Sequence, residues 1–125
     1  ALTLKSKFIS IKEVKKGGKV GYDGSWSAKK DSVIGILPIG YADGYPVTLS
    51  NNGFVLVNGK KANVIGRISM DLIAIDLTSL SNIDYESVVI LYGKGLPIEV
   101  ISKLAGIIPY SLMTSLTERV KKKYI

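Results

Sequence analysis

The chain of 125 residues contains no cysteine and no histidine. The missing cysteine excludes a disulfide-stapled scaffold and any thiolate metal site, and it is consistent with a reducing compartment. The missing histidine excludes a histidine-bound zinc site, a serine–histidine–aspartate triad and a histidine general base built from this chain alone. We therefore expect no metal site, and any acid–base chemistry has to rest on other side chains.

Arginine is scarce too. Arg67 and Arg119 are the only arginines among 17 basic residues, which exceed the 10 acidic residues and give a formal net charge of +7. A nucleic-acid binder is expected to use more arginine, because the guanidinium group makes paired hydrogen bonds to phosphate and guanine. Apart from the run Lys121–Lys123, the lysines are scattered and are expected to form a solvated surface. The charge therefore does not predict a nucleic-acid partner.

Long apolar runs are also missing, since none approaches the roughly 20 residues that a transmembrane helix needs. No secretory signal stands at the start, and Ala1 leads almost at once into strand-like sequence. We expect a cytoplasmic segment of a longer protein, with no membrane contact of its own. The length allows one domain that covers residues 1–125.

The sequence consists instead of short apolar segments separated by turns. Residues 2–14 alternate with one slip, which predicts a strand with a bulge. Further strands are predicted at 33–39, 54–57, 61–65, 68–77 and 87–92. Asn58-Gly59 lies between two of these segments and predicts a tight β-hairpin.

After Pro97 the apolar spacing becomes helical, and Gly106 is a suitable residue to end the helix. A second short helix is predicted from Pro109 to Thr117. Many short strands followed by helices predict a mainly β fold, namely a closed Greek-key-like β-barrel with one or two short C-terminal helices.

Three loops place aromatic and polar side chains beside predicted strands, where functional residues are often found. They are residues 20–26 (VGYDGSW), 40–46 (GYADGYP) and 66–71 (GRISMD). Each loop alone is consistent with ordinary turn chemistry, because aspartate caps turns and glycine supplies positive φ. Neither of the first two matches a phosphate-binding loop or a dinucleotide-binding motif.

In this order and at these separations, the three loops resemble the C-terminal domain of the alanine racemase family, whose members use pyridoxal phosphate. The family's motifs there are VGYGG, VGYADGYPR and GRVSMD. The similarity extends over essentially the whole chain, from Leu2–Lys5 to Arg119–Val120. It implies a bacterial enzyme that interconverts L- and D-alanine and supplies D-alanine for peptidoglycan in the cell wall.

The resemblance implies roles for five residues. Tyr22 resembles the tyrosine that accepts the proton of L-alanine. Met70 resembles a methionine whose backbone amide contacts the substrate carboxylate. Tyr41 and Arg67 resemble residues of the active-site entrance. Tyr110 resembles a tyrosine that hydrogen-bonds the cofactor phosphate.

The resemblance also implies that the site is incomplete in this chain. In the family, the lysine that binds pyridoxal phosphate comes from an N-terminal barrel domain of the same protein. So do a histidine and an arginine that assist the tyrosine, which needs help because the ordinary pKa of a tyrosine is about 10. The family is homodimeric, and its tyrosine and methionine serve the partner subunit's site, whereas the phosphate-binding tyrosine serves its own. The isolated chain is therefore expected to be inactive.

Four features depart from the family pattern. Val47 stands where arginine is frequent, Ser111 stands where glutamate follows the phosphate-binding tyrosine, and Asp23 stands where glycine is usual. The tail at residues 119–122 reads RVKK in place of RVPR. A carboxylate at Asp23 opposes the formation of a neighbouring phenolate unless it points into solvent.

Other functions stay open at this point. One is a racemase of another small amino acid, such as serine. A second is a small basic β-barrel that binds nucleic acid by stacking bases on Tyr22, Trp26 and Tyr41. A third is a domain that serves only for dimerisation.

Overall fold

The computed structural model describes residues 3–21 and 23–114. Within these ranges the chain forms β-strands, two short 3₁₀ helices (η) and one α-helix, followed by a helical segment that begins at Pro109. The elements are β1 (Leu4–Ser6), β2 (Ser10–Val14), β3 (Lys19–Val20), β4 (Trp26–Ser27), β5 (Ser32–Leu37), η1 (Tyr41–Asp43), η2 (Val47–Leu49), β6 (Phe54–Val57), β7 (Lys60–Ile65), β8 (Ile73–Asp76), β9 (Val89–Tyr92) and α1 (Ile98–Ala105). The predicted mainly β fold with C-terminal helices is confirmed.

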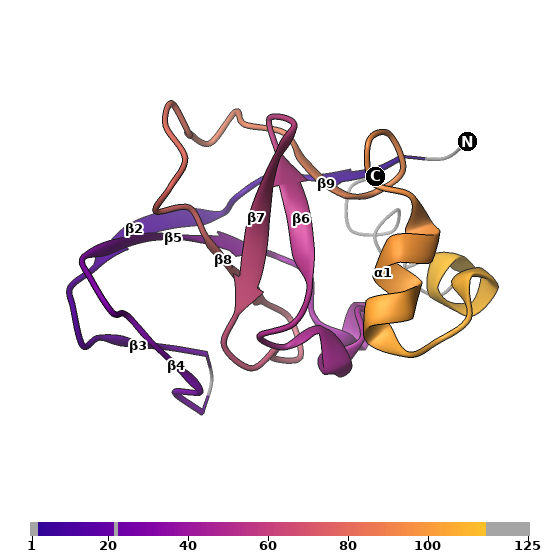
Figure 1. The fold of residues 1–125 in the computed structure, drawn as a ribbon, viewed down its shortest axis with the longest axis horizontal. Helices are drawn as coiled ribbons and strands as arrows, with labels where there is room; N and C mark the ends of the chain where they lie inside the picture. The colour runs from indigo at the N-terminus through magenta and orange to yellow at the C-terminus, as the bar shows by residue number, and fades with distance from the viewer. Residues whose placement is uncertain (1–2, 22, 115–125) are drawn as a thin grey trace.

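Seven strands form one antiparallel sheet in the order β1-β9-β6-β7-β8-β5-β2. The sheet curls strongly, and the small β3–β4 hairpin lies beside it (Figure 1). The barrel expected from the sequence is a curled half-barrel in the described residues. The sheet does not close on itself in the described residues. Its two edge strands, β1 and β2, each pair with one strand only, β9 and β5 respectively.

The single bulged strand predicted for residues 2–14 is wrong. The chain divides there into β1 and β2, which lie at opposite edges of the sheet. Phe8 lies between the two strands and is buried, and its ring occupies the space over Gly35, where a Cβ atom would approach it to 2.5 Å. The slip in the alternation therefore marks a change of strand partner and not a bulge.

The main core lies on one face of the curled sheet. It includes fully buried aliphatic residues of four neighbouring strands, namely Val55, Val57, Val64, Ile75 and Leu91. Burial of each such side chain stabilises the fold by roughly 1.5–3 kcal/mol relative to exposure. Tyr45 and Leu49, from the segment that carries the two 3₁₀ helices, complete the core at one end.

A second, smaller cluster joins Val20, Ile34, Ile65 and Ala74. Successive residues of a strand point to opposite faces, so Ile34 and Ile65 face away from the main core, on the other side of the sheet. Val20 belongs to β3, and its burial in this cluster fixes the β3–β4 hairpin against that side. The cluster thereby positions the loop that begins at Gly21.

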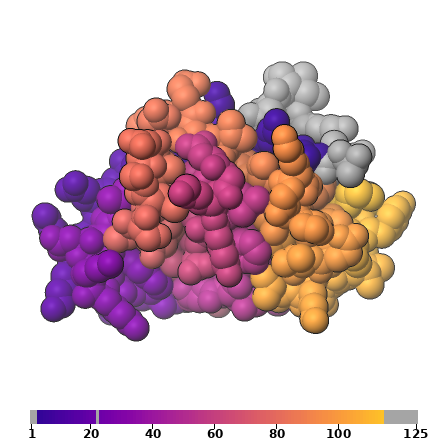
Figure 2. Space-filling model, turned by 45° about the horizontal axis from the view of Figure 1, so that its top comes forward, coloured from indigo at the N-terminus to yellow at the C-terminus, as the bar shows by residue number. Residues whose placement is uncertain are grey.

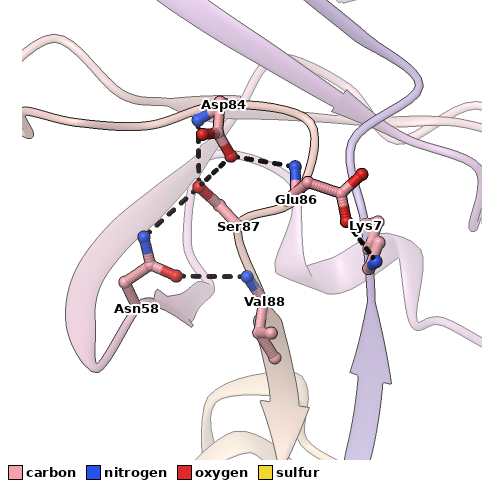
Figure 3. A network of polar contacts seen from close by, with 6 residues as sticks. All are labelled: Lys7, Asn58, Asp84, Glu86, Ser87 and Val88. Carbon is pink, nitrogen blue, oxygen red and sulfur yellow. Dashed lines mark hydrogen bonds and ion pairs between the residues drawn. The ribbon is translucent and has the colours of Figure 1, made fainter.

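The predicted hairpin at Asn58-Gly59 is confirmed, with β6 and β7 on either side. Both residues have positive φ, 49° and 83°. The side chain of Asn58 also ties the hairpin tip to the segment that enters β9, as Figure 3 shows: its amide donates to Ser87 Oγ at 3.2 Å, and its carbonyl oxygen accepts from Val88 N–H at 3.1 Å.

The helix α1 matches the predicted helix and ends at Gly106, which has a φ of 74° and donates its N–H to the carbonyl of Ser102. Ile101 and Ala105 face the core. The described part of the chain after β9 lies at one end of the molecule (Figure 2). The predicted second helix is present from Pro109 to Thr114, and its last three residues lie outside the described ranges. In the part of the chain that is described, no helix combines the length and apolarity needed to cross a membrane.

Candidate active site

The segment between β7 and β8 forms an exposed turn. Ser69 N–H donates to the carbonyl of Leu72 at 3.1 Å, and Leu72 N–H donates back to Ser69 Oγ at 3.0 Å. The strand predicted for residues 68–77 is therefore present only as β8, because these local bonds close the turn before the sheet resumes. Met70 lies at the tip of the turn with 51% of its surface exposed. The tip of this turn is therefore accessible at the surface of the described part of the chain.

The loop at residues 40–46 docks directly on that turn. Tyr41 N–H donates to the carbonyl of Ser69, and Ala42 N–H donates to the carbonyl of Met70, each at 3.0 Å. The loop's own shape is set by Asp43, a buried residue whose carboxylate accepts the N–H of Gly40 at 3.0 Å. Asp43 therefore acts as a cap within the loop, and Tyr41 is left half exposed beside Met70.

Gly40 lies where the two segments approach each other closely. A Cβ atom at this position would lie 2.3 Å from the carbonyl oxygen of Ser69 and 2.4 Å from that of Met70. No other residue fits without a shift of the backbone. Close packing therefore explains why glycine is needed at this position of the GYADGYP motif. Its φ of −148° is extended and would suit any residue.

The first loop reaches the same place through a second pair of glycines. A Cβ atom on Gly21 would lie 2.7 Å from Arg67 N, and one on Gly66 would lie 2.8 Å from the Cα of Gly21. Both glycines also have positive φ. The start of the VGYDG segment and the start of the GRISMD segment are therefore in backbone contact.

Tyr22, the predicted base, lies outside the described residues. Its neighbour Asp23 is exposed, and its carboxylate accepts the N–H of Ser25 at 3.1 Å. This carboxylate thus takes part in a local turn on the surface. The effect of its charge on Tyr22 stays a prediction.

Tyr41 and Arg67 form part of the wall of a hollow of about 500 Å³, together with Val47 and Ile107. The structure therefore brings the two predicted entrance residues together, and the docked loops place Met70 next to Tyr41. Val47, one of the departures from the family pattern noted in the sequence, lines the same hollow. Sequence reasoning did not anticipate Ile107, which follows α1 and is distant along the chain.

Tyr110 does not line this hollow. It lies on the helical segment after α1, and 71% of its surface is exposed. Its contact with the phosphate of pyridoxal phosphate stays a prediction. Ser111 follows it and is also exposed.

Tyr45, the second tyrosine of the 40–46 loop, is a structural residue. It is 1% exposed, and its hydroxyl has no hydrogen-bond partner within the described structure. Burial raises the pKa of the Tyr45 hydroxyl well above its ordinary value, because the charged form would lose its hydration. This tyrosine therefore stays protonated at neutral pH and is unsuited to act as a base.

Comparison with known proteins places this arrangement in a family. The model of the alanine racemase C-terminal domain matches residues 1–124. The chain is 45% identical over 124 residues to the alanine racemase of Pasteurella multocida, a match that covers 99% of this chain and 34% of that protein. It is 48% identical over 120 residues to the alanine racemase of Coxiella burnetii, covering 96% of this chain and 33% of that protein.

Solved structures of alanine racemases contain the same fold. The biosynthetic alanine racemase of Pseudomonas aeruginosa superimposes with a TM-score of 0.87 at 38% identity, over 94% of this chain and 33% of that chain. The alanine racemase of Bartonella henselae with covalently bound pyridoxal phosphate gives a TM-score of 0.87 at 36% identity, over 91% of this chain and 32% of that chain. The chain thus spans about a third of the length of these relatives. Sequence, fold and the convergence of the three motifs agree, and the chain belongs to the alanine racemase C-terminal domain family.

Proposed function

We propose that this chain is the C-terminal domain of a racemase that interconverts L- and D-alanine with pyridoxal phosphate, in the cytoplasm of a bacterium that uses D-alanine for peptidoglycan. The observation that carries the proposal is the junction of the three motifs. Gly21 contacts Gly66, and the carbonyls of Ser69 and Met70 hold the 40–46 loop. Three of the residues with predicted roles, Tyr41, Arg67 and Met70, therefore lie on the two loops that meet at this junction.

The chemistry explains why these groups are needed. Racemisation removes a proton from Cα on one face and returns a proton to the other face, so it needs an acid–base group on each side. When bound, the cofactor supplies an electron sink that makes this proton acidic. In the proposal, the Oη atom of Tyr22 takes the proton from L-alanine and returns it in the reverse direction, while Met70 N–H binds the substrate carboxylate.

The remaining roles concern access and assembly. Tyr41 and Arg67 line the entrance, and Tyr110 contacts the cofactor phosphate. The cofactor lysine, which serves the opposite face, belongs to an N-terminal barrel domain of the same protein. In a homodimer, Tyr22 and Met70 then serve the partner subunit's site and Tyr110 its own, so the isolated chain is inactive. The family assignment leaves the nucleic-acid alternative without a supporting observation.

The proposal is tested by assaying the isolated chain and the full-length protein with L-alanine, D-alanine and L-serine in the presence of pyridoxal phosphate. The full-length protein is expected to racemise alanine faster than serine, and the isolated chain is expected to racemise neither. Turnover by the isolated chain would contradict the requirement for a second domain. A full-length protein that prefers serine would contradict the substrate assignment.

A further inference from the structure

Two side chains from the turn after η2 hold the backbone that follows β7. Asn51 Oδ1 accepts the N–H of Gly66 at 2.7 Å, and Ser50 Oγ accepts the N–H of Ile68 at 2.9 Å. Both donors lie just beyond Ile65, the last residue of β7, so the ladder of the sheet no longer supplies their acceptors. Gly66 and Ile68 are buried, and a buried N–H that lacks a partner is costly.

Asn51 is suited to this role by its backbone as well as its side chain. Its φ is 54°, in the left-handed region that asparagine tolerates better than most residues. Glycine would adopt this φ without strain but would offer no acceptor to Gly66. Asparagine therefore satisfies two requirements at once, the turn and the hydrogen bond.

The segment that these two bonds hold, residues 66–70, contacts both of the other loops. Gly66 is in backbone contact with Gly21, which is bonded to Tyr22. On its other side, the carbonyl of Met70 accepts the N–H of Ala42. A shift of the Gly66 peptide would therefore displace Gly21, the residue that precedes Tyr22 in the chain.

We propose that Asn51 is a positioning residue of the racemase: by holding Gly66 N–H, it keeps the Tyr22 loop in place relative to the substrate. The inference rests on the proposed function. A hydrogen bond that merely stabilised the fold would affect proton transfer on both faces of the substrate equally. A bond that positions Tyr22 affects the face that Tyr22 serves.

The measurement has to distinguish proton transfer on the two faces of the substrate. L- and D-alanine have equal free energy in water, so kcat/KM in the two directions must fall together in any variant. Exchange of the α-proton with deuterium oxide, measured early in the reaction for each enantiomer, does not carry this constraint. The quantity to follow is the ratio of the L-alanine exchange rate to the D-alanine exchange rate.

The experiment uses the full-length enzyme with Asn51→Gly, which keeps the backbone conformation and removes the acceptor. Asn51→Asp restores an acceptor oxygen. The matched control is Asn82→Gly, because Asn82 also has a positive φ of 59° and its side chain makes no hydrogen bond within the described part of the chain. Ser50→Ala, which removes the neighbouring acceptor, is a second variant with the same expected direction.

We expect the exchange ratio to fall about tenfold in Asn51→Gly, the scale of effect that a small misplacement of a reacting group produces. The ratio should stay at the wild-type value in Asn82→Gly and recover in Asn51→Asp. An unchanged ratio in both Asn51→Gly and Ser50→Ala would overturn the inference, as would an equal fall in Asn82→Gly. If the wild-type enzyme exchanges neither enantiomer, the proposed function itself fails, and that result is visible without any variant.

Discussion

Gly21 and Gly66 lie so close together that a Cβ atom on Gly66 would be 2.8 Å from the Cα of Gly21 and 2.9 Å from its N atom. Each residue is the first glycine of a different motif, and the motifs are far apart in the chain. The contact explains why glycine is required at both positions. It also fixes Gly21, where the first loop begins, against the turn that carries Met70.

The first prediction concerns this contact. Gly66→Ala in the full-length enzyme is expected to lower kcat/KM for alanine by about 100-fold, because the new Cβ atom forces the two backbones apart. Gly59→Ala is the matched control, since Gly59 has a similar positive φ of 83° but no atom within 4 Å of the added Cβ. The control is expected to lose only about 1–2 kcal/mol of stability from backbone strain and to keep its activity. Equal activity in the two variants would show that the contact does not position the site.

The parts of the fold that could be predicted are those encoded by neighbouring residues. Asn58-Gly59 predicts its hairpin and Gly106 predicts the end of α1, because positive φ at these residues is a local requirement. The division of residues 2–14 could not be predicted, because it depends on pairing with β9 and β5, which are distant in sequence. The turn between β7 and β8 interrupts an alternating pattern for a local reason, because Ser69 and Leu72 bond to each other within it.

In the candidate site, too, contacts between residues distant in sequence could not be predicted. The three motifs identify its loops by resemblance, but no spacing rule predicts that Gly40 and Gly66 are contact points. Asn51 belongs to none of the three motifs, and its hydrogen-bond partner Gly66 lies 15 residues further along the chain. Residues that hold a site in place are therefore found from hydrogen bonds in the structure and not from the sequence pattern.

The second prediction concerns the buried hydroxyl of Tyr45. Removing a buried polar atom that lacks a partner relieves its desolvation cost, so Tyr45→Phe is expected to stabilise the chain by about 1 kcal/mol at pH 7. Urea unfolding measured by circular dichroism checks this. A loss of stability of similar size would show that the hydroxyl has a partner.

The third prediction concerns pH, because burial raises the pKa of Tyr45 in the folded state. Below about pH 10 both states keep the proton. As the pH rises further, the unfolded chain releases the proton while the folded chain retains it, so this residue lowers stability by about 1.4 kcal/mol per pH unit. The advantage of Tyr45→Phe over wild type should therefore grow between pH 9 and pH 11. An advantage that does not change with pH would contradict the burial of the hydroxyl.

The fourth prediction separates a buried contact from an exposed one in the network of Figure 3. Ser87 Oγ accepts hydrogen bonds from Asn58 Nδ2 and from Asp84 N–H, so Ser87→Ala is expected to destabilise the chain by about 2 kcal/mol. Lys7→Ala removes only the exposed ion pair with Glu86, at 3.0 Å, and should cost at most about 0.5 kcal/mol. Similar losses in the two variants, measured by urea unfolding, would contradict this ranking.

The proposed role of Tyr22 on one face of the substrate is tested by the effect of Tyr22→Phe in the full-length enzyme on α-proton exchange in deuterium oxide. We expect exchange of L-alanine to fall by at least about 100-fold, the usual contribution of a positioned acid–base group. Exchange of D-alanine, which the opposite face supports, should be largely retained. Equal losses for the two enantiomers would contradict the claim that Tyr22 is the base for L-alanine.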